Sequence, residues 1–313
     1  MFIAIVKKFA RLVGVLLLVS FSTFLLMFGN ATGIAQTILG LRADKASIEQ
    51  KVIELGLDRP LLMQFGDWLG GIFTGDLGQS YYTGQAVSGA LATRVPVTLT
   101  LLIVTLIITT IISVLVGVAA ASFGGWFDRV VQFFAGIGAA IPAFIVAVVL
   151  VFSFAVALPW FPATGYVTPA QSVSGWIASL ALPVAALLVG SIAGTSAQIR
   201  GAVLDTLDKD FVRTLRARGI PTGPLLFRHV LRNSSGPGLT SLSLQTIGLL
   251  GGAVFVEQVF ALPGIGQLAN TSAQRGDVPM VMGVVLVTVV MVLCVNLLTD
   301  LANTALNPKA RNR

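Results

Sequence analysis

Long stretches without a charged residue constrain this chain more than any other feature. A helix crosses a hydrocarbon core of about 30 Å with roughly 20 apolar residues. The stretches that contain no Asp, Glu, Lys or Arg are 12–28, 95–127, 130–199, 233–256 and 278–299. The 70-residue stretch from 130 to 199 is long enough for two spans with a polar turn between them. The sequence therefore predicts an all-α polytopic membrane protein with six transmembrane helices.

Composition agrees with this prediction. The 313 residues are 55% hydrophobic and 11% charged, whereas a soluble chain carries about 25% charged residues. The expected spans are about 12–28, 97–121, 131–156, 176–198, 237–256 and 280–303. Because proline removes a helical hydrogen bond, we expect Pro142 to kink the third span and Pro183 to interrupt the fourth.

The first span has a rival interpretation as a cleaved signal peptide, because a basic segment followed by an apolar stretch fits both. Its apolar part, 12–28, is longer than the usual apolar core of a signal peptide. No convincing cleavage site of small residues follows at once. We therefore favour an uncleaved first span.

We expect a single membrane domain over 1–313, which contains an insertion at 30–95 and a charged loop at 199–236. Within the insertion, a short helix is expected to end near Gly56. A second helix follows, with Pro60 in its first turn, and either lies along the membrane surface or packs on the spans. Its apolar face comprises Leu61, Phe65, Trp68, Leu69 and Ile72. A glycine-rich loop, GDLGQSYYTGQAV, comes next.

Basic residues are distributed unevenly between the two sides of the predicted spans. With the N-terminus inside, the inner segments hold 14 of the 20 Lys and Arg residues, and the longer outer segments hold six. Under the positive-inside rule, both termini and the loop 199–236 are then cytoplasmic. The formal net charge of +7 is explained by this bias, so membrane lipid and not nucleic acid is the expected contact.

The segment 205–233 is the longest strongly charged passage of the chain, and its pattern predicts two short amphipathic helices. The first shows one apolar face, made of Leu204, Leu207, Phe211 and Leu215. Gly219 is expected to end it.

The second predicted helix of 205–233 begins with Thr222 as its N-cap and ends at 233–237. Its apolar side comprises Leu225, Leu226, Val230 and Leu231, and its polar side Arg228, His229 and Arg232. Such an element docks into a partner protein or lies on anionic headgroups.

The chain offers little for catalysis. It contains no Gly-Lys dipeptide and therefore no phosphate-binding P-loop. A lone histidine, His229, and a single cysteine, Cys294, cannot build a metal site, and His229 has no nucleophile in a plausible setting. We expect no enzymatic activity, no catalytic residue, no metal and no cofactor bound by this chain.

Ion-gradient-driven secondary transport and a passive pore are the alternatives among membrane functions. Ion-coupled carriers usually bury carboxylates or histidines in their spans, and no predicted span interior here holds a charge. Uncharged polar side chains in the spans either line a pathway or form interhelical hydrogen bonds. Gln245 is the best pathway candidate, because a deeply placed amide is costly without water or a partner, and Asn296 is another.

Four passages, spread over nearly the whole chain, resemble one known family. They are GLDRPL, GDLGQS, FVRTLRARGIPTGPLLFRHVLRN and EQVFALPGIG. They are similar to passages of ABC-transporter permease subunits of the dipeptide/oligopeptide/nickel importer family, of the first-permease type. The one departure is Leu215, where such permeases commonly have alanine.

The resemblance implies roles for two segments. In this family the cytoplasmic loop forms a coupling helix that seats in a cleft of the ATPase subunit, and its fixed glycine corresponds to Gly219. The residues implied in coupling are Arg213, Arg216, Ala217, Gly219, Arg228, His229, Arg232 and Asn233. The loop after the fifth span lies near the mouth that meets a substrate-binding protein, although a re-entrant turn fits it too. The residues implied at this outer gate are Glu257, Phe260, Pro263 and Gly264.

The same resemblance implies a function in the cell membrane. The chain would form half of a translocation pathway for peptides or similar small solutes. Its expected partners are a paralogous permease subunit, two ATPase subunits that bind ATP and Mg²⁺, and an extracytoplasmic substrate-binding protein.

Overall fold

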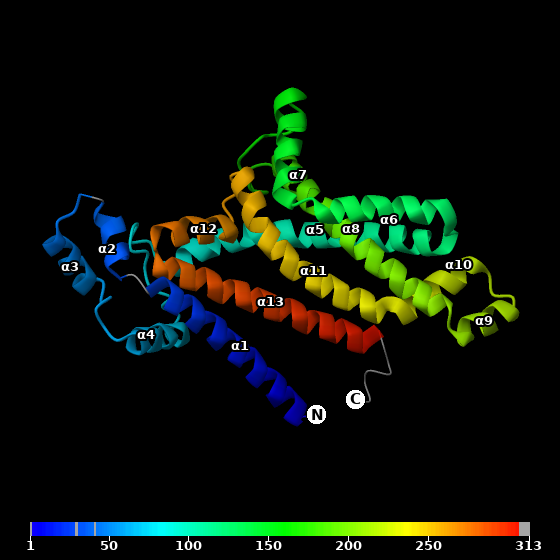
Figure 1. The fold of residues 1–313 in the computed structure, drawn as a ribbon, viewed down its shortest axis with the longest axis horizontal. Coiled ribbons are helices and arrows are strands. Elements are labelled where there is room, and N and C mark those ends of the chain that lie inside the picture. Colours follow the sequence, from blue (N-terminus) through cyan, green and yellow to red (C-terminus); the bar gives the residue numbers. More distant parts are fainter. Residues whose placement is uncertain (1, 29–30, 41, 307–313) are drawn as a thin grey trace. The chain divides into compact units, whose positions relative to one another are not determined.

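The computed structural model describes residues 2–28, 31–40 and 42–306, and most of these residues are helical (Figure 1). In the same ranges the only β-type pairing is an isolated antiparallel bridge between Gln79 and Ala86. The elements in chain order are α1 (Phe2–Phe28), α2 (Ala31–Leu39), α3 (Lys45–Glu54), α4 (Leu61–Thr74), α5 (Val87–Phe123), α6 (Gly125–Ala140), α7 (Ala143–Leu150), the π-helix η1 (Val151–Ala157), α8 (Val173–Leu207), α9 (Asp210–Ala217), α10 (Thr222–Pro224), the π-helix η2 (Leu225–Val230), α11 (Leu231–Val259), α12 (Ile265–Arg275) and α13 (Val278–Leu306).

The described residues contain four to six candidate membrane spans. Four helices are long and apolar enough to cross a membrane by themselves, namely Val87–Phe123, Val173–Leu207, Gly236–Val259 and Val278–Thr299. Two bent pairs raise the number to six if each pair forms one span, namely Val13–Met27 with Ala31–Leu39 and Gly125–Ala140 with Ala143–Ala157. The predicted all-helical class is confirmed.

The helices form two compact units. The first unit contains Met1–Thr98 and Pro263–Leu293, and the second contains Leu99–Leu262 and Cys294–Arg313. The division falls within α5 and α13, so each of these long helices contributes to both units.

Aromatic packing builds one core of the first unit. Phe65 of α4 is buried against Phe21 and Phe24 of α1, with ring centroids 5.2 and 5.4 Å apart in edge-to-face geometry. Trp68 stacks on Phe65 at 5.7 Å. Such pairs contribute about 0.5–1.5 kcal/mol each beyond the buried area. Helix α4 therefore packs its apolar face on α1, which belongs to one of the bent pairs that form a candidate span.

A buried carboxylate holds the glycine-rich loop of the first unit. Asp277, between α12 and α13, is 4% exposed and accepts hydrogen bonds from the Ser80 hydroxyl at 2.5 Å and the Tyr81 N–H at 3.1 Å. The Tyr82 hydroxyl donates to the Arg275 carbonyl. Burial, together with the charge of Asp277, raises the pKa of Tyr81 to about 12, so its phenol is protonated at neutral pH.

Helix α8 packs at close range on its neighbours in the second unit. A Cβ added to Gly117 of α5 would lie 2.9 Å from the Ser196 carbonyl oxygen, and one added to Gly138 of α6 would lie 3.1 Å from the Ala193 Cβ. Both distances are shorter than ordinary van der Waals contact. Small residues allow membrane helices to approach closely where no hydrophobic drive exists between them.

An ion pair joins α6 to α8. Both carboxylate oxygens of Asp128 accept hydrogen bonds from the Arg200 guanidinium, and the two side chains are only 17% and 25% exposed. A bidentate pair of this kind fixes orientation as well as distance. The pair was not predicted from the sequence.

Pro142 breaks the third predicted span instead of kinking it. Helix α6 ends at Ala140, α7 begins at Ala143, and the two helices are bent by 93°. Ile141 has extended backbone, with φ −86° and ψ 119°. The clash between a proline ring and the preceding residue disfavours helical backbone at that residue. The prediction of a single kinked helix over 131–156 is therefore wrong.

Two other predictions based on proline are also wrong. Pro183 lies inside the continuous helix α8, and Pro237 lies inside α11, so 233–237 does not end a helix. The φ of proline is itself helical, and membrane helices tolerate the one hydrogen bond that it removes. In addition, the passage 257–279, expected as an outer loop, contains the helix α12.

We expect Asp277→Ala to lower the free energy of unfolding by about 1–3 kcal/mol, because the Ser80 hydroxyl and the Tyr81 N–H lose their acceptor in a buried site. The thermal unfolding midpoint in detergent measures this change. Asp58→Ala, which removes an exposed carboxylate of the insertion, is the matched control. Equal midpoints for the two variants would contradict the role assigned to Asp277.

Candidate functional site

The segment 205–233 contains a helix end that the sequence predicted correctly. Gly219 follows α9 with φ +75°, in the left-handed region that favours glycine. The Gly219 N–H donates to the Arg216 carbonyl at 2.9 Å, and the Ile220 N–H donates to the Leu215 carbonyl at 3.3 Å. These two bonds form a Schellman motif, which satisfies carbonyls at the end of a helix.

The helices on either side of this turn differ from the prediction in their bounds. The predicted first helix is divided, since α8 ends at Leu207 and α9 begins at Asp210. The second helix begins at Thr222 with Pro221, not Thr222, at the N-cap, and it continues through η2 into α11. A π-helical turn such as η2 is frequent at functional sites.

The apolar side of 205–233 packs into the second unit. Val212, Leu225 and Val230 are at most 2% exposed and belong to one cluster. The other buried members are Val118, Ile199 and Val203, and Leu207, Phe211, Leu215, Ile220 and Leu231 pack against the cluster from its edge. Burying a Val or Leu side chain contributes about 1.5–3 kcal/mol. This element is therefore an attached part of the helix bundle, and both predicted apolar faces are observed.

The polar residues of the same element lie on its exposed side. Those exposed are Arg213, Arg216, Ala217, Gly219, Arg228, Arg232 and Asn233, and His229 is partly buried. Arg213 is 74% exposed and forms a long ion pair of 3.8 Å with Asp210. The segment 205–233 contains six Lys and Arg residues and three Asp residues. Its exposed side therefore presents an excess of positive charge.

An exposed aromatic residue of this element was not predicted from the sequence. Phe227 is 58% exposed, between the buried Leu226 and the exposed Arg228. Aromatic and arginine side chains are enriched where protein interfaces concentrate their binding energy. The helical pattern did not predict this exposure, because Phe227 shares a helical face with the apolar Val230 and Leu231, three and four residues further along the chain.

The two polar span residues predicted for a pathway make interhelical hydrogen bonds. The Gln245 side-chain amide donates to the Ser191 hydroxyl at 3.0 Å and joins α11 to α8. The Ser243 hydroxyl donates to the Asn296 side-chain carbonyl at 2.7 Å and joins α11 to α13. These contacts are what the interhelical interpretation expects, and they leave a pathway role for Gln245 and Asn296 as a prediction.

Two of the predicted outer-gate residues lie together in the second unit. Glu257 and Phe260, at the C-terminal end of α11, are 0% and 1% exposed. The Leu262 N–H donates to the Glu257 carbonyl at 2.8 Å, and the Gly165 N–H donates to the Phe260 carbonyl at 2.9 Å. The end of α11 is thus closed by a turn and by a contact from the loop before α8.

The other two predicted outer-gate residues belong to the first unit. Pro263 and Gly264 precede α12, and Gly264 occupies its N-cap position with extended backbone. The Ile265 N–H at the start of α12 donates to the Thr98 hydroxyl at 2.9 Å. An otherwise unpaired N–H of the first helical turn is therefore satisfied by α5.

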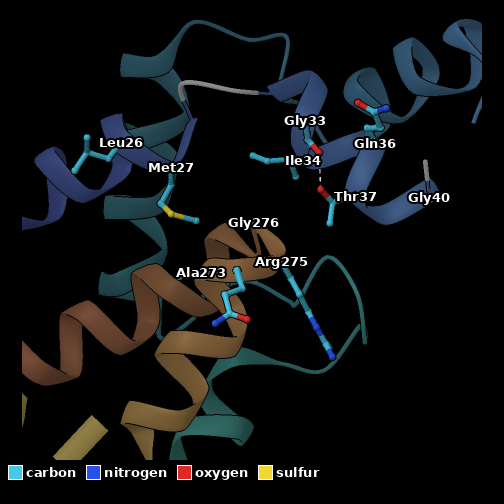
Figure 2. A pocket seen from close by; sticks show the side chains of 11 residues that line it. Leu26, Met27, Gly33, Ile34, Gln36, Thr37, Gly40, Ala273, Arg275 and Gly276 are labelled. Carbon is cyan, nitrogen blue, oxygen red and sulfur yellow. Dashed lines mark hydrogen bonds between the residues drawn. The ribbon is translucent and has the colours of Figure 1, made fainter. Parts of the chain in front are cut away.

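A cavity of about 510 Å³ in the first unit is lined by α1, α2 and the C-terminal turn of α12 (Figure 2). Its lining includes Met27, Thr37 and Arg275, and the Thr37 hydroxyl donates to the Gly33 carbonyl at 2.8 Å. None of the predicted site residues lines it. Across the described residues, no group of three or more His, Cys, Asp or Glu side chains could hold a metal ion.

Comparison with known proteins places the chain in a family. Residues 113–312 match the family described as binding-protein-dependent transport system inner membrane component, and residues 1–102 match the N-terminal family of such membrane components. A putative peptide transport system permease protein of Brucella abortus (strain 2308) is 36% identical over 308 residues, covering 98% of both chains.

Two further relatives cover the chain equally well. A probable peptide ABC transporter permease protein of Sinorhizobium fredii is 33% identical over 308 residues, covering 98% of each chain. A glutathione transport system permease protein of Pectobacterium atrosepticum is 33% identical over 307 residues, again covering 98% of each.

The chain belongs to the family of binding-protein-dependent transport system inner membrane components. It is a multi-pass membrane protein and a permease subunit of an ABC importer. The ion-gradient carrier and the passive pore, the alternatives raised by the sequence, are not favoured.

We expect Gln245→Leu and Ser191→Ala each to lower the free energy of unfolding by about 0.5–1.5 kcal/mol, as interhelical hydrogen bonds in membranes do. Because both variants remove the same bond, their effects should not add in the double variant. The double-mutant cycle compares the thermal unfolding, in detergent, of the wild type, the two single variants and the double variant. Full additivity would show that the bond contributes nothing and would strengthen the pathway interpretation of Gln245.

Proposed function

We propose that this chain forms half of the translocation pathway of an ATP-driven importer for short peptides or similar small solutes. The observation that carries the proposal is the element 205–233, whose apolar side is buried in the second unit while its cationic side is exposed. An element built in this way can bind a partner on one side and pass the partner's movement to the bundle on the other.

The peptide class is supported by the relatives. Two of them carry peptide transport in their names and a third carries glutathione transport. All three align over 98% of this chain, so the likeness includes the insertion and both predicted site segments.

The proposed topology has six spans within one permease domain, 1–313, and counts each bent helix pair as one span. Both termini and the coupling loop 199–236 are cytoplasmic, because this orientation places 14 of the 20 Lys and Arg residues inside. The insertion 30–95 is then extracytoplasmic. The chain resides in the cell membrane, surrounded by lipid.

Three kinds of partner complete the importer. A paralogous permease supplies the other half of the pathway, because one six-span chain encloses no pathway that two ATPases could operate symmetrically. Two ATPase subunits bind ATP and Mg²⁺ and carry out hydrolysis, so this chain binds no cofactor and is not itself an enzyme. An extracytoplasmic binding protein delivers the solute to the outer gate, which comprises Glu257, Phe260, Pro263 and Gly264.

Coupling runs through 205–233. Closure of the ATPases on ATP moves this element as a rigid lever, since its apolar side is packed against α5 and α8. Because η2 continues directly into α11, the movement tilts α8 and α11 and exposes the pathway alternately to each side. The contact with the ATPase is made by Arg213, Arg216, Ala217, Arg228, His229, Arg232 and Asn233, and Gly219 sets the turn between the helices.

Co-purification in detergent with candidate ATPases tests the docking role. We expect an ATPase to co-purify with the wild-type chain and to be lost when Arg216, Arg228 and His229 are changed to alanine. A few residues carry most of the binding energy of an interface, and removing one of them weakens binding about tenfold or more. Phe227→Ala alone is expected to weaken binding by a similar factor.

The matched control replaces two cations of the insertion, Arg42 and Lys45, by alanine, which matches the two arginines removed in the docking variant. This variant should retain the ATPase. If the control and the docking variant behave alike, the contact is a general effect of charge. If no protein with a nucleotide site binds the wild type, the docking role fails.

Gly219→Val should uncouple ATP hydrolysis from uptake. A β-branched residue at φ +75° costs about 1–3 kcal/mol of backbone strain, so the turn between α9 and α10 is displaced. ATP hydrolysis and solute uptake are measured together in proteoliposomes that contain the assembled importer. Gly223→Val is the control, because Gly223 is helical and a Cβ there meets nothing within 4 Å. Normal uptake by Gly219→Val would count against the lever.

A further inference from the structure

The first unit contains a second cavity, of about 270 Å³, whose lining includes none of the residues predicted for the coupling loop or the outer gate. It is lined by α4, by the loop after it and by the first turns of α13. Phe24 and Met282 contribute apolar surface, and Arg59, Asp67 and Asp76 contribute charge. A small cavity that joins an apolar wall to a few polar groups is the usual form of a ligand site.

An exposed ion pair lies on the lining of this cavity. The Arg59 guanidinium is 2.5 Å from the Asp67 carboxylate, and the two side chains are 44% and 62% exposed. The backbone of Arg59 is held by the Gln64 side-chain amide, which donates to the Arg59 carbonyl at 2.7 Å. Exposed ion pairs contribute little to stability. Arg59 and Asp67 can therefore separate and pair with the charges of a ligand at a small cost in free energy.

Trp68 and Tyr81 join Phe24 as aromatic residues of the lining. Trp68 stacks on Phe65, and its buried Nε1–H has no hydrogen-bond partner among the described residues. Tyr81 also lines the cavity and keeps its proton at neutral pH, because burial raises its pKa. The cavity therefore combines one cation, two carboxylates and three aromatic side chains, Phe24 included, within about 270 Å³.

We propose that this cavity binds a short peptide as a zwitterion. The peptide ammonium pairs with Asp67, its carboxylate pairs with Arg59, and an apolar side chain lies against Trp68. The cavity is slightly smaller than the roughly 300–1,000 Å³ of typical ligand pockets, which suits a solute of one or two residues. This proposal rests on the proposed function, since the insertion meets the solute only if it is extracytoplasmic.

Equilibrium binding tests the site on the full chain in phosphatidylcholine nanodiscs, without ATPase, ATP or binding protein. Isothermal titration with the dipeptide Ala-Phe should give saturable binding at one site per chain. The double variant Arg59→Gln/Asp67→Asn should raise Kd about tenfold or more, because two charge-assisted hydrogen-bonding groups are lost. N-acetyl-Ala-Phe-amide, which lacks both terminal charges, should bind the wild type correspondingly weakly.

The insertion offers a matched control. Lys51 and Glu54 form another ion pair, 2.7 Å apart with side chains 21% and 60% exposed, that does not line the cavity. Lys51→Gln/Glu54→Gln should bind Ala-Phe as the wild type does, with both variants checked for an unchanged thermal unfolding midpoint. Equal Kd values for the two double variants, or no saturable binding to the wild type in the millimolar range, would overturn the proposal.

Two further outcomes are decisive. If glycerophosphoethanolamine, titrated in the same way, competes with Ala-Phe for the site and binds as tightly as the dipeptide, the cavity is a site for a lipid headgroup, and the assignment to peptides is wrong. Because the titration uses no ATPase, it is independent of the coupling loop. Retained binding of Ala-Phe together with failed co-purification would reject the coupling role and leave the cavity assignment in place.

Discussion

Backbone hydrogen bonding is the constraint on which the rest of this structure depends. Hydrocarbon offers no water to pair N–H and C=O groups, so a spanning segment must satisfy them within itself, as a helix does. Where the chain leaves the helical form near α11 and α12, other segments supply the partners. The Thr98 hydroxyl accepts from Ile265, and the Gly165 N–H donates to Phe260. Non-helical backbone is thus found where neighbouring segments can pair it.

Within the second unit, α8 connects packing to the proposed function. Glycines at 117 and 138 let α5 and α6 approach it closely, and the pair between Asp128 and Arg200 fixes α6 beside it. The same helix leads into the element 205–233, whose Val212 is packed against residues of α5 and α8. A force applied to the exposed cations would therefore act on a closely packed group of helices, which is what a rigid lever requires.

The roles of the charged side chains in this chain depend on their surroundings. Asp277 is buried and satisfied by Ser80 and the Tyr81 backbone, so its contribution is to hold a loop. The pair between Arg59 and Asp67 is exposed and lines a cavity, so it contributes little to stability and its groups remain available to a ligand. A carboxylate that is buried and fully hydrogen-bonded, such as Asp277, has a structural role. An exposed carboxylate such as Asp67 is the kind that we assign to ligand binding, although the residue type is the same.

The sequence by itself determined the features that depend on near neighbours along the chain. Uncharged runs predicted the helical membrane class, the period of apolar residues predicted both faces of 205–233, and Gly219 predicted the end of α9. The sequence did not reveal contacts between distant residues, such as Asp128 with Arg200 or Ser80 with Asp277. It also treated Pro142 and Pro183 alike, although the first breaks a helix and the second does not. Tertiary packing decides these cases. A hydrogen bond lost at a proline, or a charge that becomes buried, is compensated only if the fold brings a suitable distant group beside it.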